Sequence, residues 1–437
     1  DTVVFTTTRG QPFWPASDLH PTHTIYPEFD PKQPIDPDKS WSFRFDKIGE
    51  WQFHDHLAPL FRGVITVRDS LVGIRSIEGN IQLAKKCADP TLGNKTQCWQ
   101  DALGQALDQR GIDAVFQVFS NLYDADADFR QNCHGLTHAI GQQAYKKFKN
   151  NEYIGASPKT SYCGYGFYHG FMESLVHNGA NFADAREFCV LVNKQLAQQT
   201  NVWTPCLHGI GHGVIDGSDQ TAWGNTEAFI RPGLALCEKL GVDDYEKDIC
   251  ASGVFNSLAN FYGDQKYHLP LDKQNPLAIC RKQHTTYFKA ACYEEMNTLL
   301  MSLTNEDFRH ATRFIEAMSE REYQARAIDA LASYATHFTL AENQHASDIQ
   351  TCRALQPELR APCIAGLAAG FMEFGTPEKE YAQALAVCHD SAKTFDEKKA
   401  CFGRILWLTS LKYPSEKQAM ICASVEAVYR QHCLAES

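Results

Sequence analysis

Six side chains between Cys133 and Gly213 have the types and the spacing of metal ligands. Two pairs of histidines and one histidine–glutamate pair are each four residues apart: His134 and His138, His208 and His212, and His169 and Glu173. On a helix this spacing puts both side chains on one face, one turn apart. If three such helices pack side by side, five imidazoles and a carboxylate meet. They could hold copper, iron or zinc, with Glu173 as a further ligand or a general base.

The segments that carry these histidines share a sequence pattern with later parts of the chain. Each begins with a cysteine and continues with glycine and histidine, whereas the segments opened by Cys250, Cys292, Cys363 and Cys401 lack the paired histidines. The recurring cysteine and glycine pattern is therefore structural. The paired histidines occur only at 133–213, which favours a metal site there. The spacing His-x-x-x-His is a weak pattern, so a second interpretation is that these side chains only line a polar groove or cap helices.

The sixteen cysteines recur as neighbours along the chain. Their number is even and none has the Cys-x-x-Cys spacing of a zinc ribbon or a redox motif, so we expect eight disulfides. Disulfides persist in oxidising compartments, which predicts a secreted, periplasmic or cell-surface protein. The expected pairs are Cys87–Cys98, Cys133–Cys163, Cys189–Cys206, Cys237–Cys250, Cys280–Cys292, Cys352–Cys363, Cys388–Cys401 and Cys422–Cys433.

The bulk composition narrows the class of protein. A length of 437 residues allows two or three domains, and 44% apolar with 21% charged residues is typical of a globular chain. A net charge of −11 argues against nucleic acid as a partner. No apolar run of the length that spans a bilayer occurs, so no membrane span is expected. The chain begins at Asp1 without a methionine, which indicates a processed or partial chain.

The first 69 residues read as a small β-domain. Runs of β-branched or alternating apolar residues cover 3–8, 40–45, 51–56 and 63–67, with proline and aspartate between them. If Trp51, Phe53 and Asp55 face the core, His54 and His56 share the opposite face of the strand.

These residues resemble the cupredoxin family, the copper-binding β-sandwiches that also build multicopper oxidases. The resemblance rests on residues 23–25, on 43–54 and on 59–67, and covers about the first 68 residues. That is less than a whole cupredoxin, so the opening strands are expected to lie upstream, be missing or come from another chain. In blue-copper members a cysteine, a histidine and a methionine ligand stand where this chain has Asp55, Ala58 and Phe61. A blue centre needs the thiolate, so none is expected.

The resemblance implies a different copper site. The segments His-Pro-Thr-His and His-Asp-His are similar to those with which multicopper oxidases hold copper between domains; here they contain His20, His23, His54 and His56. Four grouped histidines suit Cu(II), and the site would face a neighbouring domain or subunit. The alternative is a degenerate cupredoxin that serves as a structural module.

After a linker at 70–79, residues 80–437 read as an α-helical hairpin repeat, an α-solenoid. Amphipathic runs replace β-branched ones, and the opening cysteine of each pair recurs at about the period of helical-hairpin solenoids. Residues 308–337 fit a further hairpin without cysteines. Glycines near the start of the second helices suggest close helix contacts: Gly135, Gly166, Gly209, Gly253, Gly366 and Gly403. The expected fold class is α+β multidomain.

Three functions are compatible with this reading. The first is an extracytoplasmic metal-binding protein that handles copper in the β-domain and a second transition metal in the helical part at 133–213. The second is a structural or assembly protein that binds a partner or another copy of itself through the edge of the β-domain or the solenoid surface. The third is an extracytoplasmic metalloenzyme with an open coordination position at the helical histidines.

Overall fold

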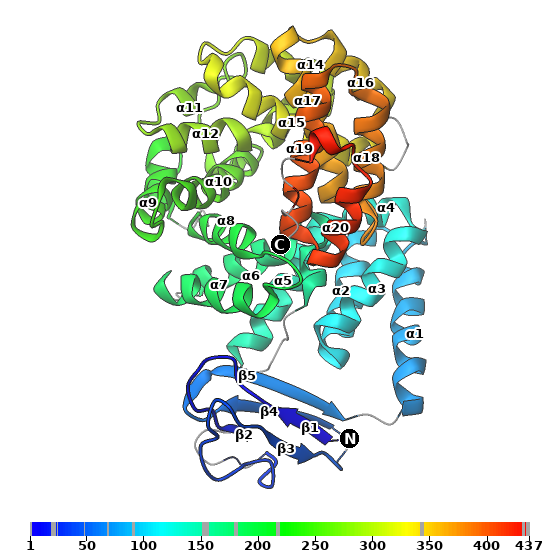
Figure 1. The fold of residues 1–437 in the computed structure, drawn as a ribbon. Helices are drawn as coiled ribbons and strands as arrows, with labels where there is room; N and C mark the ends of the chain where they lie inside the picture. The colour runs from blue at the N-terminus through cyan, green and yellow to red at the C-terminus, as the bar shows by residue number, and fades with distance from the viewer. Residues whose placement is uncertain are drawn as a thin grey trace.

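The computed structural model describes residues 2–18, 23, 25–47, 49–67, 70–89, 92–150, 157–178, 182–215, 219–340, 345–430 and 433. In this part of the chain a small N-terminal β-structure precedes a much larger helical part (Figure 1). None of the described helices combines the length and the apolar character needed to cross a membrane.

The β-structure consists of two antiparallel sheets. Strand β1 (Thr2–Phe5) pairs with β3 (Trp41–Arg44), and the second sheet has the order β2 (Pro15–Ser17), β4 (Gly49–Asp55), β5 (Ala58–Val67). An aromatic core contains Tyr26, Phe29 and Phe45, and Trp51 and Phe53 of β4 pack against it. Strands β1, β3, β4 and β5 overlap the predicted runs, whereas β2 was not predicted, and a cupredoxin sandwich stays a prediction.

Twenty α-helices follow in the described chain. They are α1 (Ser70–Lys86), α2 (Lys95–Arg110), α3 (Ile112–Ala125), α4 (Ala127–Gln131), α5 (Cys133–Lys149), α6 (Tyr162–His177), α7 (Phe182–Leu196), α8 (Trp203–Val214), α9 (Thr226–Leu240), α10 (Asp244–Phe261), α11 (Ala278–Arg281), α12 (Thr286–Glu295), α13 (Asn297–Leu303), α14 (Phe308–Glu316), α15 (Gln324–Thr339), α16 (His345–Ala354), α17 (Pro357–Phe374), α18 (Glu380–Ser391), α19 (Phe395–Lys412) and α20 (Ser415–Ala423).

The stretch 70–79, which we expected to be a linker, lies inside α1. Ile77 and Ile81 explain the difference, because they stand four residues apart and both pack against the core of the first helices. That is the spacing of an amphipathic helix. The expected hairpin without cysteines is present as α14 and α15.

Eight disulfides join the helical hairpins, and they connect the neighbour pairs that the spacing predicts. The described cysteines include no free thiol. The repeated helical hairpins expected from the cysteine spacing are therefore present in the structure.

One helix from each hairpin lies on the inner side of a curved row. Along this row α5, α6, α8, α10, α12, α15, α17 and α19 contact one another in turn, and α17 also contacts α6. In Figure 1 the row passes from the cyan helices through green and yellow, and the red helices return beside the cyan ones. An open solenoid is thus not confirmed, because the row turns back on itself.

Polar contacts join the two ends of the row. Tyr162 donates to Glu378 Oε1 at 2.9 Å, and the backbone N–H of Asn201 donates to the carbonyl of Leu411 at 2.6 Å. Tyr123 also donates to the carbonyl of Phe374. Helices from the two ends of the row therefore contact each other directly.

Glycines allow the inner helices to pack backbone to backbone. A methyl group on Gly170 of α6 would collide with the carbonyl of His138, and one on Gly253 of α10 with the carbonyl of His208. Gly166, Gly209 and Gly366 are similarly crowded. Gly135 departs from the prediction, since a methyl group there would meet nothing within 4 Å. It lies on the open side of α5, which faces a cavity.

Candidate metal centre

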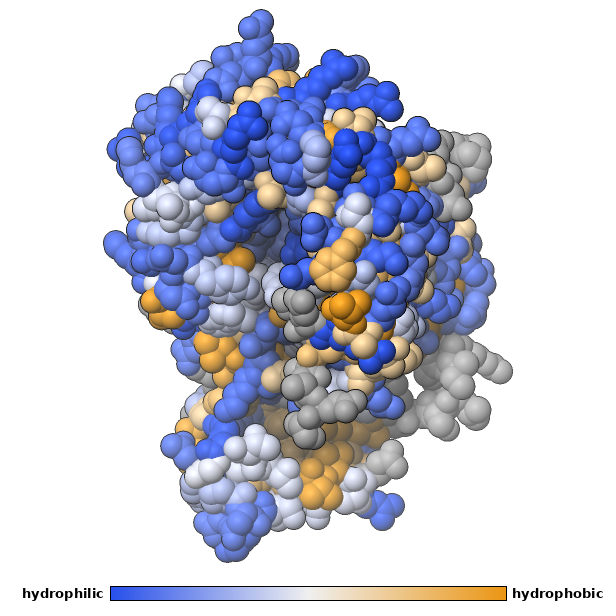
Figure 2. Space-filling view, turned by 45° about the horizontal axis from the view of Figure 1, so that its top comes forward, coloured by the Kyte–Doolittle hydropathy of each residue, from blue (hydrophilic) through white to orange (hydrophobic). Residues whose placement is uncertain are grey.

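The inner helices enclose a cavity of about 800 Å³. On the face drawn in Figure 2 the helical part is mostly hydrophilic and is hollowed near its middle. The cavity lining comes from both ends of the row and includes all six predicted ligands of the helical cluster: His134, His138, His169, Glu173, His208 and His212. Side chains 78 residues apart in the sequence, from His134 to His212, thus share one space.

The five imidazoles form a continuous group. His134 and His138 lie on α5, His169 on α6, and His208 and His212 on α8. The ring centre of His169 is 5.2 Å from those of His134 and His138, 4.7 Å from that of His208 and 4.9 Å from that of His212. The middle helix therefore places its imidazole between the two pairs.

The potential ligand atoms divide into two overlapping triads. In His134, His138 and His169 these atoms lie within 4.8 Å of one another, and the same holds for His169, His208 and His212. We expected the five imidazoles to turn toward one shared pocket. They do share the cavity, but they surround two points, and His169 belongs to both groups.

Two serines of α10 orient the second triad. His208 Nδ1 lies 2.6 Å from Ser252 Oγ, whose hydroxyl donates to the carbonyl of Ile249 at 2.7 Å. Ser252 must therefore accept from His208, which leaves the lone pair of His208 on Nε2. Ser257 Oγ lies 2.9 Å from His212 Nδ1. The Nε2 atoms of His208 and His212 lie within hydrogen-bond distance of each other, at 3.1 Å.

A backbone carbonyl orients the first triad. His134 Nδ1 lies 2.7 Å from the oxygen of Cys163, and His138 Nε2 lies 3.3 Å from His169 Nδ1. We expected a regular helix from Cys163, but the residues from Cys163 to Tyr165 have φ between 51° and 64°. Gly164 in the middle tolerates this left-handed turn. The turn exposes the Cys163 carbonyl that holds His134.

Burial determines the protonation of the imidazoles. It lowers the pKa of His134 and of His208 to about 3, and it lowers those of His169 and His212 well below the usual value; the neighbouring imidazoles add to the effect. Histidine binds a metal in its neutral form. At neutral pH these four side chains therefore offer their lone pairs without first losing a proton.

Glu173 lies beside both triads. Its Oε2 is 3.8 Å from His138 Nδ1, and its Oε1 is 4.0 Å from His212 Nδ1. Burial opposes ionisation of this carboxyl, yet the hydrogen bond and charge of His138 lower its pKa below the usual value. An ionised carboxylate near the imidazoles fits a cation site.

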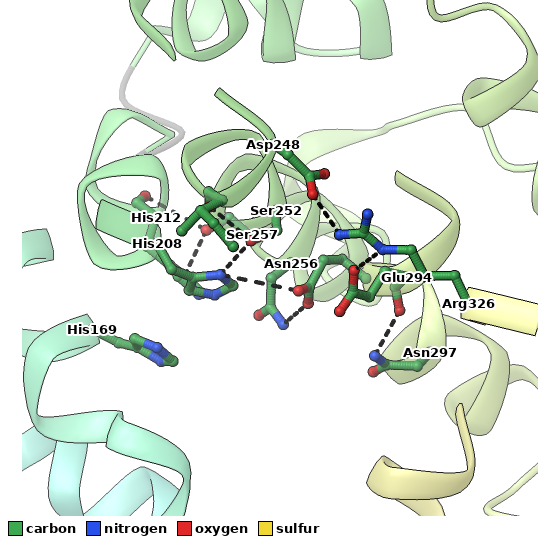
Figure 3. A network of polar contacts seen from close by, with 12 residues as sticks. His169, His208, His212, Asp248, Ser252, Asn256, Ser257, Glu294, Asn297 and Arg326 are labelled. Atoms are coloured by element: carbon green, nitrogen blue, oxygen red, sulfur yellow. Dashed lines mark hydrogen bonds and ion pairs between the residues drawn. The ribbon is translucent and has the colours of Figure 1, made fainter. Parts of the chain in front are cut away.

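A polar network lies next to the second triad, and its members Asn256, Glu294 and Glu295 line the cavity (Figure 3). Arg326 pairs with Asp248 at 2.6 Å and with Glu294, whereas Glu295 accepts from Asn256 at 2.7 Å and lies 4.0 Å from His208. Burial raises the pKa of Glu295 well above the usual value. The network links the second triad to charged groups on α12 and α15.

Several polar atoms in this wall lack a hydrogen-bond partner among the described residues. They are Asn297 Oδ1, Thr298 Oγ1 and Arg404 Nε, all of them buried in residues that line the cavity. Burying such atoms without a partner is costly, so the wall near them is a destabilised part of the fold.

Sequence reasoning missed the serines, Glu295 and His337, which also line the cavity. Ser252 stands two residues after Cys250, as His208 does after Cys206. The position relative to the cysteine could therefore have identified Ser252, because corresponding positions on consecutive inner helices face the same cavity.

The β-domain holds a third group of histidines. The ligand atoms of His23, His54 and His56 lie within 4.8 Å of one another, whereas His20 lies outside the described residues. His23 Nε2 is 2.9 Å from His56 Nδ1. His23 Nδ1 contacts Asp30 at 2.6 Å and His54 Nδ1 contacts Asp18 at 2.5 Å.

The histidine group of the β-domain is more buried than predicted, since we expected it on an outer face. His54 is 1% exposed and His23 is 5% exposed, so both are buried within the β-domain itself. Asp55, which stands at the cysteine position of blue-copper proteins in the resemblance, turns away to pair with Arg9 and to accept from the backbone N–H of Trp14 at 2.9 Å.

Comparison with known proteins supplies no relative: no family model, curated protein or solved structure matches the chain. The interpretation of the site therefore depends on its own geometry.

Proposed function

We propose that this chain is an extracytoplasmic metal-binding protein whose helical cavity holds a transition metal. One observation carries the proposal. Nε2 of His208 and Nε2 of His212 face each other at 3.1 Å, while serines engage both Nδ1 atoms. Two nitrogens bound to one tetrahedral ion at about 2.0–2.1 Å lie about 3.3 Å apart. The pair is thus close to the geometry of two ligands on one ion.

The eight disulfides support an extracytoplasmic location, because such bonds are rare where thiols are kept reduced. Seven of the eight join cysteines 11 to 17 residues apart, and Cys133–Cys163 joins cysteines 30 residues apart. Closing a loop of about 15 residues contributes about 3 kcal/mol in the chain-entropy model. Disulfides hold the helix starts in place without ligating the metal.

Copper is the proposed occupant of the β-domain, where His23, His54 and His56 converge. Imidazole ligands suit Cu(II), and the carboxylates of Asp30 and Asp18 hold the outer nitrogens of His23 and His54. The absence of a thiolate predicts weak colour near 600 nm. Intense absorption there would contradict this assignment.

Metal analysis of the untagged, natively produced protein tests the helical site. We expect transition metal in near-stoichiometric amount. The double substitution His138→Ala, His212→Ala should remove the metal that is bound at the helical site. The matched control replaces the exposed His284 and His310 by alanine and should leave the metal content unchanged. Unchanged metal content in the first variant, with its disulfides and helicity intact, would refute the site.

The cavity favours a metalloenzyme as the second candidate function. It offers about 800 Å³ beside the histidines, and its lining includes further polar side chains such as Asn256 and Glu294. A small polar molecule would fit between the metal and the cavity-lining side chains of Asn256 and Glu294. Turnover that requires the bound metal would establish this role. A partner-binding or self-assembling protein should instead be metal-free and associate in solution.

A further inference from the structure

We propose that the helical cavity holds two transition-metal ions, one in each triad, and that His169 is a ligand of both. This inference rests on the proposed metal-binding function and specifies what the site contains. The ligand atoms of the described residues group as His134, His138 and His169 on one side and as His169, His208 and His212 on the other.

The distances within each triad fit one ion. His138 Nε2 and His169 Nδ1 are 3.3 Å apart, and the Nε2 atoms of His208 and His212 are 3.1 Å apart. Ligands of a tetrahedral ion are separated by about 3.3 Å when the metal–nitrogen bonds measure about 2.0 Å. Ring centres within each triad are 4.7–5.2 Å apart, whereas those of His138 and His212, one from each triad, are 6.1 Å apart. Two ions therefore satisfy these distances better than one.

The position of His169 allows it to serve both ions. Its Nδ1 faces His138, and its ring lies 4.7 Å from that of His208 and 4.9 Å from that of His212. Figure 3 shows its imidazole across from His208 and His212. Imidazole carries its two nitrogens on opposite sides of the ring. When the second ion binds, it replaces the remaining N–H proton of His169, which passes to solvent.

The position of Glu173 near both triads also supports two ions. One carboxylate oxygen lies 3.8 Å from His138 of the first triad, and the other lies 4.0 Å from His212 of the second. A carboxylate that reaches both groups offsets charge at two ions at once. Glu295, 4.0 Å from His208, adds a second carboxyl beside the second triad.

The helix packing explains why the shared ligand comes from α6. This helix lies between α5 and α8 in the row. A methyl group on Gly170 of α6 would collide with the carbonyl of His138, and one on Gly209 of α8 would lie 2.7 Å from the carbonyl of Tyr168. These approaches bring the three backbones close enough for an imidazole of the middle helix to reach both sides.

The test counts Cu(II) ions bound by the full chain in a background without the β-domain histidines: His23→Ala, His54→Ala, His56→Ala. We expect two ions per chain in this background. We expect one ion after His134→Ala, which opens only the first triad, and one after His208→Ala, which opens only the second. His169→Ala should weaken both ions, and His169→Gln repeats that test in a side chain of similar size.

Electron paramagnetic resonance of the same samples provides a second readout. Two Cu(II) ions bridged by an imidazole lie about 6 Å apart, given two bonds of about 2 Å, and their coupling should reduce the isolated-copper signal. The single-ion variants should restore it to one spin per copper. One ion per chain with a full signal in the background protein would overturn the two-ion proposal but leave the metal-binding function standing. No bound ion in a natively folded sample would overturn both.

Discussion

At the scale of residues, the histidines depend on small partners that set their orientation. Ser252 accepts from His208 Nδ1 at 2.6 Å and donates to the carbonyl of Ile249, so its hydroxyl fixes which nitrogen faces the cavity. Partners of this kind usually contribute 10- to 100-fold in metal affinity. We therefore expect Ser252→Ala to weaken metal binding at the second triad by about 10- to 100-fold.

A chelator-competition titration measures this loss. Ser302→Ala, at an exposed serine of α13, is the control and should bind metal as the unmodified chain does. Equal affinity for the two variants would show that the serine does not orient His208.

Asp30 has the corresponding role in the β-domain. It is buried, contacts His23 Nδ1 at 2.6 Å and accepts from the indole N–H of Trp14 at 2.8 Å. Burial opposes its ionisation, but hydrogen bonds from Lys32, Trp14 and His23 lower its pKa below the usual value. Asp30→Asn should lower copper affinity by about 10- to 100-fold.

Isothermal titration with Cu(II) in the His138→Ala, His212→Ala background isolates the β-domain site. Asp36→Asn is the control, because Asp36 is exposed and pairs with Lys39. If both variants bind copper as tightly as the parent does, Asp30 does not orient a copper ligand.

At the scale of elements, glycine determines how close the inner helices come. Gly170→Ala would push a methyl group into the carbonyl of His138, and overpacking of this kind costs about 1–3 kcal/mol. Because α5 and α6 would separate, the first triad should also lose metal affinity. Gly104→Ala in α2 is the control, since its methyl group would meet nothing within 4 Å. It should stabilise the helix by up to about 1 kcal/mol.

Denaturant unfolding of the two variants measures the difference. The prediction requires opposite signs at the two glycines. If Gly170→Ala also increased the free energy of unfolding, backbone contact between α5 and α6 would not be what positions His138.

Much of the helix arrangement could be predicted from the sequence, because the local spacing of residues determines the hairpins and the helix faces. The cysteine intervals predicted the hairpins, and the four-residue intervals placed His134 with His138 and His208 with His212 on single helix faces. The division into two triads could not be predicted in this way. It depends on the left-handed turn at Cys163, whose carbonyl contacts His134, and on the packing of α6 between α5 and α8, and both are tertiary features.

At the scale of the whole molecule, closure of the row could not be predicted either. Hairpin repeats alone permit an open superhelix, and contacts between residues far apart in the sequence decide between the two forms. Here Tyr123 donates to the carbonyl of Phe374, and Tyr162 donates to Glu378. These contacts bring the two ends of the row together around a half-open cavity with the histidines on one wall.

Weakening these contacts should therefore open the cavity further without altering the metal ligands. Tyr123→Phe combined with Tyr162→Phe removes two hydrogen bonds, each contributing about 0.5–1.5 kcal/mol, between the first and last hairpins. We expect EDTA to strip metal several-fold faster from this variant, while the amount of metal bound at equilibrium stays the same. Tyr287→Phe, which removes a hydrogen bond to Glu238 within adjacent hairpins, is the matched control. Equal stripping rates for the double variant and the unmodified chain would mean that metal leaves by a route that does not require the ends of the row to part.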